Sequence, residues 1–252
     1  MKKLLLALIL AWILFTGCVQ EPEEKPAVLP ANVEKVSFQT FDGVIIKANY
    51  FPSSAEQPVG VILLHMLGQD KSSWNEFASK LQENGFTVLA IDFRGHGESI
   101  LQDSKTLNWN KFSETEFNLM TQEVASAKSF LTKKGINEDR VFIAGASLGA
   151  NIALNYAITD SQLKGIALLS PGLNYKGVLT LLAVRKIVST PVLFVASNED
   201  SYAFSSAKQL FNETIGSEKQ LMLLEGKGHG SEMLKDENVS ATIINWLKEK
   251  NQ

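Results

Sequence analysis

Runs of consecutive apolar residues recur along most of the chain, and between them apolar residues return with helical spacing. A short, wholly apolar run is typical of a parallel strand buried on both faces, whereas the spaced pattern predicts amphipathic helices. Strands that alternate with helices predict a parallel sheet covered by helices on both faces. The predicted parallel strands lie near residues 61–65, 87–92, 141–147, 165–170, 191–197 and 220–225.

Two further segments carry more specific signals. Residues 33–40 and 44–51 flank Phe41-Asp42-Gly43, and an Asp-Gly turn between two such runs predicts a β-hairpin. With these two strands added, the sequence predicts an α/β fold with a mostly parallel sheet of eight strands. The clearest helix is expected to begin at the capping box Ser113-Glu114-Thr115-Glu116 and to end at Gly135.

The composition is consistent with one globular domain over residues 33–252. Of the 252 residues, 45% are hydrophobic and 20% are charged, which is enough for a sizeable core and ordinary for a globular protein. The formal net charge is −3, and the basic residues are not clustered. We therefore do not expect a nucleic acid as a partner.

The N-terminus has the features of an export signal. Met1-Lys2-Lys3 is positively charged, and the apolar stretch from Leu4 to Thr16 is too short to span a bilayer comfortably. Residues 1–17 are therefore predicted to be a signal peptide. The end of this segment, Leu14-Phe15-Thr16-Gly17-Cys18, resembles the lipobox of prokaryotic lipoproteins. The resemblance implies that Cys18 carries a lipid after cleavage, and the alternative is an uncleaved anchor.

The residues around this site agree with a lipid anchor. Cys18 is the only cysteine in the chain, so it has no partner for an intrachain disulfide. Residues 18–32 are rich in proline and glutamate, which predicts a disordered tether. The predicted location is the cell envelope, outside the cytoplasm, with the domain held to a membrane by its N-terminal lipid.

A serine stands at a predicted strand-to-helix turn. Gly145-Ala146-Ser147-Leu148-Gly149 follows an apolar run and opens a helix-like segment, which is the arrangement of a nucleophile elbow. The turn is sharp, and a side chain at either glycine would collide with the neighbouring strand or the incoming helix. Ser147 is therefore the candidate nucleophile, and the N–H of Leu148 is a candidate donor to a developing oxyanion.

An elbow serine needs a base, and the chain holds three histidines, His65, His96 and His229. In proteins with a nucleophile elbow of this kind, the catalytic residues follow one another in the order serine, acid, histidine, so the base lies after Ser147. Only His229 meets this condition. It follows an apolar run, in a glycine-rich loop.

The acid that orients the histidine is sought at the end of a strand between these two residues. Residues 191–196 form a predicted buried strand, and Asp200 follows at its carboxyl end, where open α/β sheets hold their chemistry. Glu199 is the neighbouring alternative. Asp160 follows a predicted helix and is placed at the wrong end of the sheet.

These residues resemble the α/β-hydrolase superfamily over nearly all of the chain from about Val33. Residues 61–68 are similar to the strand and loop that usually read His-Gly-x-Gly, and residues 91–99 to the Asp-x-Arg-Gly-His-Gly-x-Ser segment. The resemblance implies an α/β-hydrolase fold, Asp200 as the acid, and the N–H of Leu67 as the second oxyanion donor. Met66 stands where glycine is usual, so the path of this loop stays open.

Four other polar residues in these motifs are given structural roles. His65 and His96 are expected to hydrogen-bond loop backbone near the site. Asp92 and Arg94 are expected to form ion pairs that organise a loop. Between Pro171 and Pro191 the sequence leaves room for only a small lid, with a short amphipathic helix over residues 178–186.

The predicted function is hydrolysis of a small-molecule carboxylic ester or thioester through an acyl-enzyme, without a metal or organic cofactor. One alternative is a serine peptidase, because residues 117–154 also resemble the catalytic domains of prolyl oligopeptidases. A second alternative is a binding lipoprotein that keeps the fold without turnover. A dienelactone hydrolase is disfavoured, since that family uses cysteine at the position of Ser147. The sequence makes no prediction about the oligomeric state.

Overall fold

The computed structural model describes residues 33–216 and 218–252. The predicted signal peptide of residues 1–17, the lipidation site Cys18 and the tether of residues 18–32 lie outside the described residues. Among the residues that are described, no helix has the length and apolar character needed to cross a membrane.

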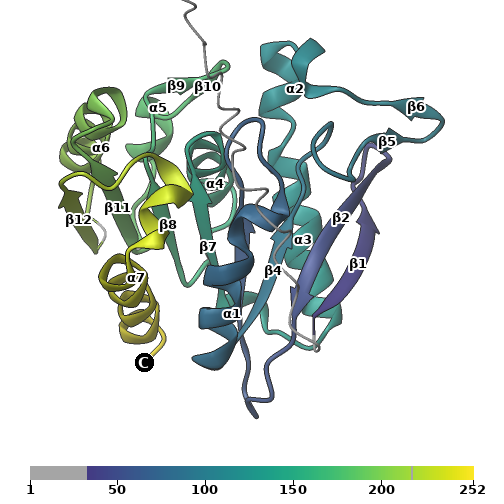
Figure 1. Cartoon of the computed structure of the whole chain (residues 1–252), viewed down its shortest axis with the longest axis horizontal. Coiled ribbons are helices and arrows are strands. Elements are labelled where there is room, and N and C mark those ends of the chain that lie inside the picture. The colour runs from purple at the N-terminus through teal and green to yellow at the C-terminus, as the bar shows by residue number, and fades with distance from the viewer. Residues whose placement is uncertain (1–32, 217) are drawn as a thin grey trace, which may run out of the picture.

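A large sheet forms the centre of the molecule, with helices on both faces (Figure 1). The predicted hairpin is confirmed, since β1 (Glu34–Gln39) pairs antiparallel with β2 (Val44–Phe51). β2 in turn pairs antiparallel with the first strand of the parallel part. The parallel part runs, in spatial order, through β4 (Phe86–Ile91), β3 (Val59–Leu64), β7 (Val141–Ala146), β8 (Gly165–Leu169), β11 (Val192–Ser197) and β12 (Lys219–Leu224).

The prediction of eight strands is correct for the main sheet but misses its outer edge. Within the described residues the sheet has ten strands, because β5 (Leu101–Gln102) pairs with β2, and β6 (Lys105–Thr106) pairs with β5. Each of these strands is two residues long and largely exposed. They have no apolar alternation that a sequence pattern could reveal.

Each face of the sheet has its own core, because side chains alternate along a strand. On β3, Ile62 and Leu64 belong to one core, while Val61 and Leu63 belong to the other. The first core is covered by α3 (Thr121–Lys133), α4 (Leu148–Ala157), α5 (Leu181–Val184) and α6 (Ser201–Glu213). The second is covered by α1 (Asn75–Glu83) and α7 (Glu237–Lys250).

The helix predicted over residues 113–135 is wrong in one respect. The capping box is present, with Ser113 N donating to Glu116 Oε2 at 2.7 Å, but the chain forms α2 (Glu114–Asn118) and then a separate α3. Between them Met120 N bonds to Phe117 O at 3.2 Å, a tighter turn than an α-helix makes. Both side chains are buried in the core, and this tight turn connects the two helices.

The short amphipathic helix predicted over residues 178–186 is also wrong, because its first residues form a strand. Val178–Leu179 forms β10, which pairs with β9 (Asn174–Tyr175), and only the four residues of α5 are helical. The hairpin turn has positive φ at Lys176 (54°) and Gly177 (80°), and Asn174 Oδ1 accepts from Gly177 N at 2.8 Å. This turn chemistry outweighs the helical spacing of the apolar residues.

The order of the strands brings two loops together at a position where ligands commonly bind in α/β folds. The chain leaves β3 towards β4 on one side and later returns to β7 on the other side of β3. The loops after β3 and β7 therefore meet where the strand order reverses, at the carboxyl ends of the strands. The loop after β3 contains Leu67, and the turn after β7 contains Ser147.

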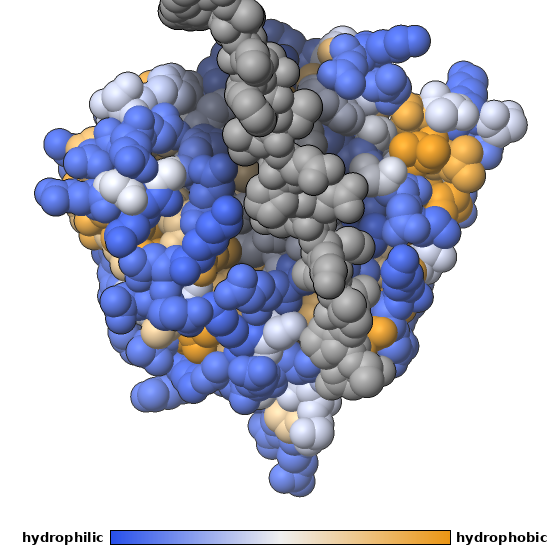
Figure 2. All heavy atoms as spheres, viewed as in Figure 1, coloured by the Kyte–Doolittle hydropathy of each residue, from blue (hydrophilic) through white to orange (hydrophobic). Residues whose placement is uncertain are grey.

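On the face shown in Figure 2, most of the coloured surface is hydrophilic, and the largest apolar patch lies at the edge that carries β5. Large exposed apolar side chains at this edge are Phe41 in the β1–β2 turn, Ile100 and Leu101.

We expect the central strand to carry much of the stability. Replacing Ile62 by alanine removes a side chain that is fully buried and leaves a cavity, so the free energy of unfolding should fall by about 2–5 kcal/mol. Leu223→Ala on β12 is the matched control, because Leu223 is 40% exposed, and it should cost less than about 1 kcal/mol. Urea unfolding of both variants measures this, and equal losses would contradict the assignment of the core.

Candidate active site

The serine elbow has a strained backbone that close packing maintains. Ser147 has φ 52° and ψ −117°, outside the regions that L-residues favour, and its N–H donates to Leu169 O at 2.8 Å. A Cβ at Gly145 would lie 2.3 Å from Gly149 O, and a Cβ at Gly149 would lie 2.3 Å from Leu64 O. As the sequence predicts, one glycine makes room for the helix and the other for the neighbouring strand.

His229 and Asp200 lie in contact. Asp200 follows β11, and its Oδ2 meets His229 Nδ1, while its Oδ1 accepts from Ala203 N at 3.0 Å and caps α6. The alternative acid, Glu199, accepts from Gly228 N at 2.8 Å through its Oε2 and makes no contact of this kind with the imidazole. Its carboxylate supports the backbone of the loop that carries His229.

One short segment fixes both Ser147 and the histidine loop. Leu169 O accepts from Ser147 N, and the next residue, Ser170, accepts from Gly230 N at 2.9 Å through its hydroxyl. A Cβ on Gly230 would lie 3.3 Å from the Ala146 side chain, so the histidine loop packs against the elbow itself. The end of β8 thereby brings the two predicted residues to the same place, 82 positions apart in the sequence.

A tyrosine that the sequence motifs do not reveal completes this cluster. The Tyr175 ring meets the His229 ring edge-on, with centroids 6.4 Å apart, and its hydroxyl donates to Ser170 O at 3.3 Å. In the described part of the chain, no hydrogen bond joins Ser147 directly to His229. Burial, with the nearby charge of Asp200, raises the pKa of Tyr175, so the phenol stays protonated at neutral pH.

Two backbone N–H groups lie beside the elbow. Leu148 opens α4, and the first N–H groups of a helix have no partner within the helix. Leu67 lies in the loop after β3, and the packing of Gly149 against Leu64 O and His65 O brings this loop to the N-terminus of α4. The hydrogen bonds of the described residues include none donated by the N–H of Leu67.

His65 fixes the loop that contains Leu67. Its Nδ1 donates to Met66 O at 2.7 Å, and its Nε2 accepts from Phe93 N at 3.0 Å, which defines a neutral imidazole. Gln69 N also donates to Met66 O at 3.1 Å and closes the turn. Burial lowers the pKa of His65 to about 4, so the ring stays neutral near pH 7.

His96 plays a similar structural part. Its Nδ1 donates to Arg94 O at 2.9 Å, and its ring stacks on Trp109 with centroids 5.1 Å apart. Burial, with the proximity of His65, lowers its pKa to about 4. Both histidines thus hydrogen-bond loop backbone, as expected from the sequence.

The motif residues Asp92 and Arg94 form separate ion pairs. Asp92 pairs with Lys71, with Nζ–Oδ2 at 2.7 Å, and also accepts from the backbone N–H of Lys71. Arg94 lies between Glu123 and Asp42, with its Nη1 2.8 Å from Asp42 Oδ2. These pairs organise the loop after β4, as predicted.

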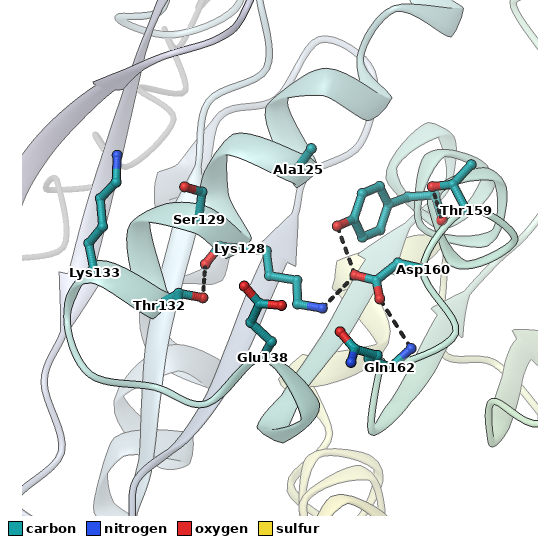
Figure 3. A pocket seen from close by; sticks show the side chains of 10 residues that line it. Ala125, Lys128, Ser129, Thr132, Lys133, Glu138, Thr159, Asp160 and Gln162 are labelled. Carbon is teal, nitrogen blue, oxygen red and sulfur yellow. Dashed lines mark hydrogen bonds and ion pairs between the residues drawn. The ribbon is translucent and has the colours of Figure 1, made fainter.

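A pocket of about 600 Å³ lies elsewhere, and its lining includes Lys128 and Asp160 (Figure 3) as well as Tyr156 near the C-terminal end of α4. Tyr156 lies nine positions after Ser147 along α4, or about 13 Å away at the rise of an α-helix. Lys128 and the Tyr156 hydroxyl both bond to Asp160, so the main polar groups satisfy one another. Asp160 therefore lines this pocket and lies away from His229. The pocket is not part of the candidate site. Among the described residues, no cluster of potential ligands could hold a metal ion.

A mostly parallel sheet with a strained serine at its switch point defines the α/β-hydrolase class of proteins. Residues 56–188, slightly more than half of the chain, match the family described as serine aminopeptidase, S33. The chain belongs to this family and is a hydrolase-type enzyme.

Individual relatives are distant. The chain is 29% identical to the thiohydrolase apmlB of Arthrinium phaeospermum over 55% of its length and 43% of the relative's length. It is 24% identical to the polyketide transferase ATR5 of Stachybotrys chlorohalonatus over 56% of its length and 46% of that protein's. The chain thus matches less than half the length of each of these curated relatives.

Solved structures support the fold. The α/β hydrolase GrgF from Penicillium sp. sh18 matches with a TM-score of 0.73 at 18% identity, over 88% of this chain and 99% of that one. A soluble variant of monoglyceride lipase from Saccharomyces cerevisiae, in complex with a substrate analog, matches with a TM-score of 0.71 at 16% identity, over 91% of this chain and 99% of that one.

The buried histidines predict a loss of stability in mild acid. Their folded pKa of about 4 lies below the ordinary 6.5, so the unfolded chain binds protons first as the pH falls below 6.5. Between pH 7.5 and 5.0, each histidine should reduce the free energy of unfolding by about 2 kcal/mol. Urea unfolding at both pH values measures the loss. For His96→Gln, the free energy of unfolding should fall by about 2 kcal/mol less over this pH range than for the wild type. An equal fall in both proteins would contradict the assignment of His96 as a buried neutral histidine.

Proposed function

We propose that this protein is a serine hydrolase that cleaves carboxylic esters or thioesters through an acyl-enzyme, with Ser147, His229 and Asp200 as its catalytic residues. The contact between Asp200 and His229, packed against the serine elbow, is the observation that carries the proposal. A carboxylate on Nδ1 keeps the proton there and leaves Nε2 free to accept the proton of a nucleophile.

In the proposed cycle, His229 Nε2 takes the Ser147 proton as the serine oxygen attacks the carbonyl carbon. Asp200 stabilises the imidazolium, and the N–H groups of Leu148 and Leu67 bind the negative oxygen of the tetrahedral intermediate. The C–O or C–S bond then breaks, and His229 returns the proton to the leaving group. Water repeats the attack on the acyl-enzyme, again through His229, and releases the acid.

The surroundings of Ser147 favour a neutral acyl substrate over an aminoacyl one. A peptidase that binds a free amino terminus needs an acidic group to hold the ammonium. Asp200 is already shared between His229 and the cap of α6, and Glu199 bonds to the backbone of Gly228. The similarity to a thiohydrolase also supports thioesters. The description of the family keeps the peptidase as the second candidate.

We also propose that the protein is a lipoprotein of the cell envelope, attached to a membrane through Cys18. The support is the sequence alone, since a lipobox-like segment precedes the single cysteine of the chain. A segment the length of residues 18–32 could hold the domain up to about 50 Å from the bilayer when extended. Such an anchor would leave the catalytic domain in contact with substrates outside the cytoplasm.

Covalent labelling by a fluorophosphonate tests the catalytic assignment, because the probe needs an activated serine and no knowledge of the substrate. Ser147→Ala and His229→Ala should abolish labelling of the full chain, and Asp200→Asn should slow it by about 10³–10⁴-fold. A panel of esters, thioesters and aminoacyl amides then separates the two candidate activities.

Glu199→Gln is the matched control, since it removes the carboxylate next to Asp200 and weakens one backbone hydrogen bond. It should stay within about fivefold of the wild-type rate. Slower labelling of Glu199→Gln than of Asp200→Asn would mean that Glu199, rather than Asp200, is the acid. A folded wild-type protein that is not labelled would favour the non-catalytic binding protein.

Lipidation is tested separately by fractionating cells that express the full chain. The wild-type protein should be in the membrane fraction, with a mass increase on the peptide that begins at Cys18, because acyl chains partition into the bilayer. Cys18→Ser should retain an unprocessed leader without the added mass. An unmodified Cys18 in the wild-type protein would exclude the lipid anchor.

A further inference from the structure

Met66 connects the loop after β3 to the loop that carries His229. It precedes Leu67, at the position where the sequence motif usually has glycine. Its side chain reaches the histidine loop, because a Cβ on Gly230 would lie 2.3 Å from Met66 Sδ and 3.1 Å from Met66 Cγ. The sulfur is therefore in van der Waals contact with the backbone of Gly230, the residue directly after His229.

The backbone at Gly230 is enclosed on its other sides. Its N–H donates to Ser170 Oγ at 2.9 Å, and the same Cβ position lies 3.3 Å from the Ala146 side chain. Gly230 itself is buried. The Met66 thioether thus fills the space that a side chain at position 230 would take, and a larger group on the sulfur has no room on that side unless the histidine loop moves.

A thioether is a group that peroxides can enlarge. The peroxide transfers one oxygen atom to the sulfur, which loses two electrons, and the O–O bond breaks to leave water or, from an organic peroxide, an alcohol. The product is a methionine sulfoxide, which is polar and accepts hydrogen bonds. Such a group is unfavourable in a buried contact unless a donor meets its oxygen.

The histidine loop has little to offer a sulfoxide oxygen. The N–H groups of residues 228–230 already donate, to Glu199, Glu232 and Ser170 respectively. Met66 is half-buried, so an oxidised side chain can satisfy its oxygen by turning out to water. Either a clash with Gly230 or this rotation removes the contact that supports the loop beside His229.

Burial distinguishes Met66 from most of the other methionines. Four of the five methionines in the chain lie in the part that the structure describes. Met120 and Met233 are fully buried, which protects their sulfur atoms from a dissolved oxidant. Met222 is half-buried like Met66, but it lies within β12 and pairs with Val195 of β11.

We propose that Met66 is an oxidation site through which peroxides inactivate the enzyme, because its sulfoxide displaces the loop that carries His229. This inference rests on the proposed function. A displaced base slows the chemical step, so the oxidised protein should lose kcat rather than affinity. Because methionine sulfoxide can be reduced enzymatically, the inactivation should be reversible.

The test is treatment of the full chain with hydrogen peroxide, followed by hydrolysis of p-nitrophenyl butyrate and mass analysis of the peptide that contains Met66. In the wild type this peptide should gain one oxygen. The kcat should fall by about tenfold or more, since a general base contributes about 10²–10⁴-fold, while KM stays within about threefold. A methionine sulfoxide reductase should restore the activity, which a merely unfolded protein would not regain.

Two variants locate the effect. Met66→Leu keeps an apolar side chain of similar size without a sulfur, so peroxide should change its kcat by less than about twofold relative to the same variant untreated. Met222→Leu is the matched control, since it removes a half-buried methionine from β12, and peroxide should inactivate it as it does the wild type. Cys18 is present in all three proteins, so its oxidation does not explain a difference between them.

Three results would overturn the inference and leave the hydrolase proposal intact. These are equal inactivation of Met66→Leu and the wild type, an added oxygen on Met66 without loss of activity, and a Met66 that stays unmodified while Met222 is oxidised. If the untreated wild type neither hydrolyses the ester nor reacts with a fluorophosphonate, the proposed function fails and the inference with it.

Discussion

The arrangement of the site depends on how closely the first turn of α4 approaches the end of β3. At Gly149 the backbone of the helix lies so near Leu64 O that no side chain could be inserted. This approach forces the chain through the strained backbone at Ser147 and sets Leu148 N–H beside the loop that contains Leu67. The strain costs of the order of 1–3 kcal/mol and is offset by the fully buried strands on either side.

The loop that carries His229 is attached to this centre as well as to the loop after β11. The end of β8 receives a hydrogen bond from the elbow and one from the histidine loop, so one dipeptide aligns two distant parts of the chain. His65 fixes the turn after β3 as a neutral group. Since its geometry does not depend on protonation near pH 7, the loop would keep its shape while His229 changes its charge in the proposed mechanism.

Much of the fold follows from the sequence because the strands are buried on both faces. Such strands appear as wholly apolar runs, and the Asp-Gly turn marks the hairpin before them. The two-residue strands β5 and β6 carry no such pattern. Apolar spacing predicts a helix over 178–186, but hydrogen bonds from the side chains of Asn174 and Asn151 to the backbone decide that segment instead. Tyr175 has no motif around it, and its place depends on the hairpin that the spacing did not predict.

Asp200 connects the chemistry of the site to the architecture, because its two oxygens have different partners. One caps α6 and the other faces His229. The carboxylate therefore cannot turn about its own axis to follow a proton without releasing the helix. Its rotational freedom is already lost when the protein folds. In the proposed mechanism, the acid is therefore a stationary counter-charge, and the imidazole is the group whose charge changes beside it.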